Sequence, residues 1–310
     1  MELATHQEAL AAQGLGVCSI TYDTREVLAD FAARRGITFP MLSDPDLHII
    51  RRFGVFNETV APETYQYGVP HPGIFFVDAG GVVREKYFEE QYYHRMALPT
   101  ILNGRSPEVP PDARLAWEGE NVRIWTWALP SQARPGLRLG LFIHVAPASG
   151  VHVYAPGGPD YLRAVTPEVA PSPYYIVHAP PYPDPEAMAE EILGETLRVY
   201  RKPFTIRVDI ALAPRKDLEP IYGAGSRFTV AGVLRWQACT DVLCWPPAET
   251  PVAWDLGLDP PDLERVPEHL RRQPKVHHSP LTQPGTCRVP EGGSLCRAHP
   301  HRGTPRAGEG

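Results

Sequence analysis

Hydrophobic and polar residues alternate with a period of two through much of the second half of the chain. The alternation is clearest in residues 204–212, where every second side chain is large and apolar. Comparable runs occupy residues 121–129, 137–145, 151–154, 228–236 and 251–256. Because successive side chains of a strand point to opposite faces, these runs, separated by Pro and Gly turns, predict an all-β antiparallel sandwich.

The first hundred residues have a different pattern. Apolar residues recur at helical spacing in residues 2–12, 25–35, 46–53 and 92–102. Short apolar runs at residues 15–21, 37–42, 74–78 and 82–88 predict strands, and Ala79-Gly80-Gly81 predicts a hairpin turn between the last two. Strands that alternate with helices are typical of an α/β sheet.

The two patterns divide the chain. We predict an α/β domain in residues 1–103, a polar, proline-rich linker in residues 104–116 and the sandwich in residues 117–256. Residues 257–310 are expected to be a largely disordered tail, because they have few large apolar side chains. The tail contains Cys287, Cys296, His299 and His301. Their spacing fits no common zinc site, so we expect no metal and no other cofactor.

Charge and hydropathy remove several functional classes. The 310 residues have a formal net charge of −6, so the electrostatic pattern of a nucleic-acid-binding protein is missing. No apolar run reaches the 18 residues of a membrane span, and the first residues have no apolar segment typical of a secretory signal. The sequence alone leaves the cellular compartment unknown.

The candidate chemistry is a cysteine pair. Cys239 and Cys244 are two of only five cysteines, and Trp236 and Trp245 flank them. Closing such a short loop stabilises a protein by only about 2 kcal/mol, and weakly stabilising disulfides tend to be the labile ones. We therefore expect a redox-active disulfide, with a static disulfide or two buried thiols as alternatives. Asp241, between the cysteines, is expected to shape the turn, with tuning of the pKa of a neighbouring thiol as the alternative.

Several separated motifs of the first domain resemble the redoxin (AhpC/TSA peroxiredoxin) family. They are GLGVCSITYDTREVLADFAARRGITFPMLSD, IIRRFGVFN and YGVPHPGIFFVDAGGVV. The resemblance implies a thioredoxin-like fold, with Pro72 as a cis-proline that shapes the active site and Arg95 as an arginine aimed at the thiolate.

The same resemblance implies that this domain is incomplete at its N-terminus. In that family the redox cysteine begins the helix after the first strand, which here would lie upstream of Met1. Cys18 falls within an apolar run and is expected to be buried and structural. Peroxidase activity is therefore not expected of this chain, although a longer gene encoding a peroxiredoxin-type antioxidant enzyme is an alternative.

The second domain is similar to the N-terminal domain of DsbD. The motifs that carry this resemblance are GVHVYAPGG, ILGETLRVYRKPFTIRVDIAL and LRWQACTDVLCWPPAE. It implies an immunoglobulin-like sandwich in which Cys239 and Cys244 are the redox pair and Gln237 and Trp245 shape the site. It also implies that a loop at residues 190–194 shields the disulfide.

The combined resemblance implies a bacterial-type thiol–disulfide oxidoreductase or electron-relay protein. Its partners would be thioredoxin-like or membrane thiol–disulfide proteins, outside the cytoplasm by family analogy. A non-catalytic binding or scaffold protein with a structural disulfide is the alternative from another class.

Overall fold

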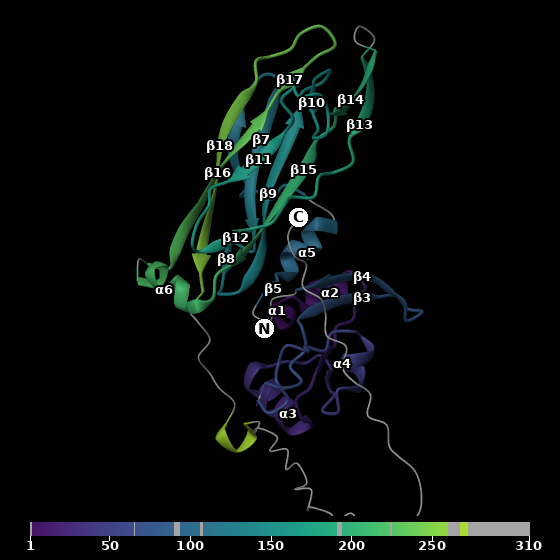
Figure 1. Cartoon of the computed structure of the whole chain (residues 1–310), viewed down its shortest axis with the longest axis vertical. Helices are drawn as coiled ribbons and strands as arrows, with labels where there is room; N and C mark the ends of the chain where they lie inside the picture. The colour runs from purple at the N-terminus through teal and green to yellow at the C-terminus, as the bar shows by residue number, and fades with distance from the viewer. Residues whose placement is uncertain are drawn as a thin grey trace, which may run out of the picture.

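An elongated β-sandwich and a smaller α/β part make up the computed structural model (Figure 1). The structure describes residues 2–64, 66–89, 94–105, 108–190, 194–223, 225–259 and 267–271. Most of the tail predicted to be disordered, including Cys287, Cys296, His299 and His301, lies outside these residues. A short 3₁₀-helix, η1 (Glu268–Leu270), belongs to the described part.

The α/β part contains short elements. They are α1 (Glu2–Thr5), α2 (Gln7–Ala12), β1 (Ser19–Thr21), α3 (Arg25–Arg35), β2 (Met41–Ser43), α4 (His48–Arg52), β3 (Gly73–Val77) and β4 (Val83–Phe88). The best-defined helix is α3. The Oγ1 atom of Thr24 accepts a hydrogen bond from the Val27 N–H at 3.5 Å, and Gly36 ends the helix with φ of 60°.

The strands of the α/β part form two separate sheets. β1 pairs in parallel with β2, and β3 pairs antiparallel with β4. The single sheet that the sequence pattern suggested is therefore divided in two among the described residues.

The helix expected at residues 92–102 begins later. Residues 92 and 93 lie outside the described part, Arg95–Met96 forms a strand, β5, and α5 spans Leu98–Arg105. β5 pairs in parallel with a sandwich strand, because the Arg95 N–H donates to the Gly136 carbonyl at 2.9 Å and the Ala97 N–H to that of Arg138 at 2.8 Å. These long-range hydrogen bonds override the local helical pattern.

The sandwich consists of short and long strands and one helix. They are β6 (Arg114–Glu118), β7 (Val122–Leu129), β8 (Gln132–Ala133), β9 (Leu137–Pro147), β10 (His152–Tyr154), β11 (Thr166–Val169), β12 (Tyr175–Val177), β13 (Glu186–Glu190), β14 (Glu195–Tyr200), β15 (Phe204–Leu212), α6 (Arg215–Gly223), β16 (Arg227–Trp236), β17 (Ala238–Cys239) and β18 (Ala248–Leu258). The strand predicted at residues 204–212 coincides with β15. The division at residues 103, 116 and 256 stays a prediction, with β6 beginning at Arg114 and β18 continuing to Leu258.

Two sheets enclose the main core. One has the strand order β12-β15-β9-β7-β6 with β5 attached to β9, and the other has the order β11-β16-β18-β8. The indole N–H of Trp254 on β18 donates to the carbonyl of Phe142 on β9 at 3.2 Å, which joins the two layers. Leu139, Leu141 and Ile143 of β9 are fully buried between them. The predicted immunoglobulin-like sandwich and α/β redoxin-type part are confirmed.

A third sheet positions the cysteines. Its strand order is β13-β14-β10-β17, and Cys239 is the last residue of β17. In Figure 1, β17 and β10 lie at the end of the sandwich that is remote from α3 and α4.

Candidate functional site

The two cysteines stand opposite each other in a tight hairpin. Cys239 and Cys244 form an isolated antiparallel bridge around the turn at residues 240–243. Inside the bridge the Thr240 N–H donates to the Leu243 carbonyl at 2.7 Å, and on its other side the Trp245 N–H donates to the Ala238 carbonyl at 3.0 Å. Backbone pairing on both sides of the bridge therefore fixes the two cysteines face to face.

Cys239 and Cys244 form a disulfide, with their Cα atoms 4.1 Å apart. The bond spans only five positions of sequence. The predicted pairing is thus present, which excludes the alternative of two separate buried thiols.

The two sulfur-bearing residues differ in their access to solvent. Cys239 is 1% exposed, whereas Cys244 belongs to the exposed residues. The turn between them projects into solvent, with Val242 96% exposed and Leu243 54% exposed. The Cys244 side of the hairpin is therefore its more exposed side.

The Tyr154 side chain, on the neighbouring strand β10, contacts both sulfur atoms. Its hydroxyl donates a hydrogen bond to the Cys239 Sγ at 3.1 Å and lies 3.8 Å from the Cys244 Sγ. β10 places it there, because β10 pairs antiparallel with β17 and aligns His152 with Cys239. Tyr154 and Cys239 share a small buried cluster with Leu197 and Val199. Sequence reasoning missed this tyrosine, since no local signal connects residues 85 positions apart.

Gln237 and Trp245 contact the hairpin, and their predicted role in shaping the site stays a prediction. The Gln237 side chain accepts from the Arg163 N–H at 3.0 Å and donates to the Trp245 carbonyl at 3.2 Å. Trp245 is partly buried and packs against the main core. Trp236, 2% exposed, donates its indole N–H to the Thr250 hydroxyl at 3.0 Å. Hydrogen bonds and buried tryptophan packing thus surround the base of the hairpin.

The turn is shaped by Thr240 rather than by Asp241, which corrects the sequence expectation. The Thr240 Oγ1 accepts hydrogen bonds from the N–H groups of Val242 at 3.3 Å and Leu243 at 3.0 Å. Asp241 is exposed at the tip. A hydroxyl at the first turn position reaches the following backbone N–H groups, as in other Ser/Thr turns.

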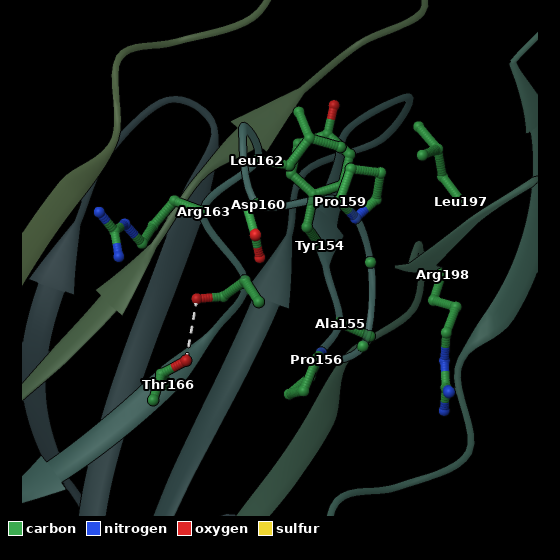
Figure 2. Close-up of a pocket in the computed structure, with 13 residues that line it drawn as sticks. Tyr154, Ala155, Pro156, Pro159, Asp160, Leu162, Arg163, Thr166, Leu197 and Arg198 are labelled. Carbon is green, nitrogen blue, oxygen red and sulfur yellow. Dashed lines mark hydrogen bonds between the residues drawn. The ribbon is translucent and has the colours of Figure 1, made fainter. Parts of the chain in front are cut away.

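A small cavity of about 260 Å³ adjoins the tyrosine (Figure 2). Its lining includes Tyr154, Asp160, Arg163, Leu197 and Arg198. Because Tyr154 and Leu197 also contact the Cys239 cluster, the cavity lies beside the buried sulfur, with charged side chains around it.

The residues expected from the redoxin resemblance lie elsewhere. Pro72 precedes β3 in the α/β part, far from β17 (Figure 1), so the structure does not bring it to the disulfide. Its peptide bond is trans, because the cis bond among the described residues precedes Pro130. The Arg95 guanidinium donates to the His94 carbonyl at 2.7 Å. Its role toward a thiolate stays a prediction.

Cys18 is not the buried structural residue that its apolar neighbours suggested. It is exposed, carries a free thiol and precedes β1 rather than lying within it. The apolar run is only partly covered, because β1 has a strand on one side only among the described residues.

Two further features bear on the sequence predictions. Across the part of the chain that the structure describes, no group of three or more His, Cys, Asp or Glu side chains could hold a metal ion, and no helix could span a membrane. Ile192 and Leu193, in the loop expected to shield the disulfide, lie outside the described residues, and the flanking strands β13 and β14 pair antiparallel.

The immunoglobulin-like sandwich thus presents a disulfide on an exposed hairpin. Residues 128–255 match the family model described as thiol:disulfide interchange protein DsbD, N-terminal, and residues 1–86 match that of the AhpC/TSA family. The chain therefore combines a redoxin domain with a DsbD N-terminal domain, both of which are thiol–disulfide exchange modules.

Curated relatives match the redoxin part. Two proteins from Mycobacterium tuberculosis strains H37Rv and CDC 1551, each named "Putative peroxiredoxin", are 36% identical to this chain over 74 residues. The match covers 23% of this chain and 44% of each relative. The chain thus spans less than half the length of the curated relatives it matches.

Two solved structures are similar to part of the chain. The reduced N-terminal domain of DsbD from Neisseria meningitidis is 20% identical, with 38% of this chain and 76% of that chain covered and a TM-score of 0.24. The N-terminal periplasmic domain of ScsB from Proteus mirabilis is 17% identical, with 48% and 49% covered and a TM-score of 0.28.

Proposed function

We propose that this protein exchanges disulfides with thioredoxin-like proteins, with Cys244 as the sulfur that the partner attacks and Cys239 as the resolving cysteine. The observation that carries the proposal is the unequal exposure of the two residues. Cys239 is 1% exposed and Cys244 is exposed. An attacking thiolate must reach a sulfur along the axis of the disulfide, so the accessible sulfur is the one attacked.

The reaction proceeds in two exchanges. A partner thiolate attacks the Cys244 Sγ, a new intermolecular S–S bond forms, and the Cys239 sulfur leaves with the electron pair of the broken bond. The partner's second cysteine thiolate then attacks the sulfur of the partner's first cysteine, which is bonded to Cys244 in the mixed disulfide. This forms the partner's disulfide and releases the Cys244 thiolate. The protein gains two electrons and two protons, and the partner becomes a disulfide.

The reverse sequence oxidises the protein again. The Cys244 thiolate attacks a partner disulfide, and the Cys239 thiolate then resolves the mixed disulfide and releases the reduced partner. Tyr154 contributes as a positioning residue. Its hydroxyl is already directed at the Cys239 Sγ, so it stabilises the negative charge that appears there when the bond breaks.

The experiment is a comparison of two trapping variants. Both are made in a background where Cys18, Cys287 and Cys296 are replaced by serine, so that one thiol remains in each. We expect Cys239→Ser, which keeps the exposed Cys244, to form a stable mixed disulfide with a thioredoxin that lacks its second active-site cysteine and whose first is activated as a mixed disulfide with thionitrobenzoate, which leaves as the free thiolate. Cys244→Ser, which keeps the buried Cys239, should form at least about tenfold less, because its sulfur is covered.

Mass spectrometry of the trapped complex identifies the linked cysteines. Equal trapping by the two variants, or trapping through Cys239 alone, would contradict the proposed order of attack. A disulfide in the unsubstituted protein that resists a reduced thioredoxin until the sandwich unfolds would instead indicate a static bridge in a binding or scaffold protein.

A further inference from the structure

Reduction of the disulfide would leave a negative charge in a buried place. In the proposed exchange the Cys239 sulfur departs with an electron pair, yet Cys239 is only 1% exposed. The buried cluster around it includes the apolar side chains of Leu197 and Val199. Because a buried charge without a counter-charge is costly, the reduced protein must either protonate this sulfur or hold a cation beside it.

The strand pairing places a histidine beside this sulfur. His152 is the first residue of β10 and pairs with Cys239 in the antiparallel ladder between β10 and β17. Directly opposed residues of such a ladder have their side chains on the same face, with Cβ atoms about 4.5–5.5 Å apart. His152 is 3% exposed, so its imidazole lies in the protein interior on the side of Cys239.

Tyr154 shares this face with His152, because the two residues are two positions apart on β10. Their rings form an edge-to-face contact, with centroids 5.3 Å apart and planes at 79°. The Tyr154 hydroxyl donates to the Cys239 Sγ at 3.1 Å. A donor directed at a group that can ionise favours its charged form, so this contact suits a thiolate at Cys239.

The charged groups that neighbouring strands place on this face have contacts of their own. On β14, Glu195 lies on the same face as Tyr154 by register and accepts a hydrogen bond from the Tyr161 hydroxyl at 2.8 Å. On β13, the Glu186 Oε1 lies 3.9 Å from the Lys202 Nζ. Both carboxylates are therefore engaged away from the sulfur.

The charged groups of the adjoining cavity are also directed elsewhere. Asp160 and Arg163 line the cavity beside Tyr154, and in Figure 2 both side chains extend away from the tyrosine hydroxyl. In the described part of this face, His152 is thus the basic side chain that the register places beside Cys239.

We propose that His152 and Cys239 form an imidazolium–thiolate pair in the reduced protein, with the Tyr154 hydroxyl as a second donor to the sulfur. On reduction the partner supplies two electrons, the S–S bond breaks, and the two protons taken up reside on His152 and on the Cys244 sulfur. On oxidation the Cys239 thiolate attacks the mixed disulfide, its bond to Cys244 forms, the partner leaves as a thiolate, and His152 returns to its neutral form.

This inference extends the proposed exchange, in which Cys239 is the resolving cysteine. The thiolate rather than the thiol is the nucleophile, so a resolving sulfur that is already ionised attacks without first losing a proton. Ionisation of Cys239 is measured without any partner, and the pair and the exchange reaction can therefore fail separately.

The test measures the thiolate of Cys239 at pH 7 by its ultraviolet absorbance. It uses Cys244→Ser in the single-thiol background described above, and the chain with all five cysteines replaced by serine supplies the baseline. The comparison variant adds His152→Phe, which keeps an aromatic ring against Tyr154 but cannot be protonated.

We expect Cys239 to be more than about half ionised at pH 7, whereas an ordinary cysteine is ionised to a few per cent. His152→Phe should lower the thiolate at least about tenfold. His144→Phe is the matched control and should leave the thiolate unchanged, because that imidazole lies on β9 and its Nδ1 contacts the Thr205 hydroxyl at 2.9 Å.

A second measurement needs no substitution, which keeps the test decisive if His152→Phe fails to fold. Nitrogen NMR of the histidines in the unsubstituted protein is recorded at pH 8, where ordinary histidines are neutral. Reduction should add one doubly protonated imidazole to the spectrum. Two results would overturn the proposal: an equal thiolate fraction with and without His152, and a histidine spectrum in which reduction adds no imidazolium.

Discussion

At the scale of single residues, one hydroxyl makes the two halves of the disulfide chemically unequal. The Tyr154 hydroxyl lies 3.1 Å from the Cys239 Sγ and 3.8 Å from the Cys244 Sγ. The hydrogen bond strengthens as charge develops on the nearer sulfur. In the exchange proposed above, burial and hydrogen bonding favour Cys239 as the leaving sulfur and Cys244 as the sulfur that a partner attacks.

We predict that Tyr154→Phe slows reduction of the disulfide by dithiothreitol about tenfold or more, since hydrogen bonds to charged groups contribute about 1.5–3 kcal/mol. Stopped-flow tryptophan fluorescence measures the rate, because Trp236 and Trp245 flank the pair. Tyr161→Phe is the matched control, as that hydroxyl bonds Glu195 instead. Reduction of the Tyr154→Phe variant at the unsubstituted rate would show that the hydroxyl has no part in the exchange.

At the scale of elements, α5 is joined to the sandwich through a glycine of β9. The Thr100 hydroxyl of α5 donates to the Leu129 carbonyl at 2.5 Å and accepts from the Gly140 N–H at 3.0 Å. A Cβ atom at Gly140 would lie 2.8 Å from the Thr100 Cγ2 and 2.7 Å from the Phe142 Cε2. Only glycine leaves room for the helix here.

Gly140→Ala should therefore lower the free energy of unfolding by about 1–3 kcal/mol, the usual cost of an overpacked core. Urea denaturation followed by circular dichroism gives the value. In the control variant, Gly158→Ala, the nearest heavy atom is the Ala155 carbonyl oxygen at 3.9 Å, so its stability should stay within about 0.5 kcal/mol of the original. A loss of equal size in both variants would exclude the proposed crowding.

The elements that the sequence predicted well are those with strong local signals. The alternation in residues 204–212 defined β15, and Thr24 and Gly36 defined the ends of α3. β5 was predicted as helix because its strand conformation depends on hydrogen bonds to residues about forty positions away. The exposure of Cys18 and the contact of Tyr154 with the sulfurs likewise depend on tertiary placement, which periodicity does not contain.

At the scale of the whole molecule, a buried ionic cluster connects the α/β part with the sandwich. The Arg138 guanidinium of β9 lies 3.7 Å from the Glu89 carboxylate and 3.0 Å from that of Asp209. Glu89 and Asp209 are 6% and 3% exposed. Burial raises the pKa of Glu89, and the Asp209 charge adds to this, while the Arg138 charge opposes it.

We predict that Arg138→Met lowers the free energy of unfolding by about 3–5 kcal/mol at pH 8, because a buried carboxylate loses its counter-charge. The pKa of Glu89, already raised, should rise further. The folded protein then binds more protons than the unfolded chain above the usual glutamate range, so stability falls as pH rises and is regained on acidification. Urea titrations at pH 5 and pH 8 should show the smaller loss at pH 5.

The control for this prediction is the double variant Glu89→Gln/Arg138→Met. It has no carboxylate at position 89, so its loss of stability relative to Glu89→Gln should depend much less on pH. A loss in Arg138→Met that is equal at both pH values would show that Glu89 is not the group left without its counter-charge.

β17, which begins the hairpin with the disulfide, and the helices α3 and α4 of the α/β part lie toward opposite ends of an elongated molecule (Figure 1). The disulfide sulfur atoms of the hairpin cannot reach the other end of the same molecule while the chain stays folded. Any process that linked the two would need a diffusing carrier or an encounter between two molecules. Its rate would therefore depend on concentration, and dilution would separate the two ends kinetically even though one polypeptide contains both.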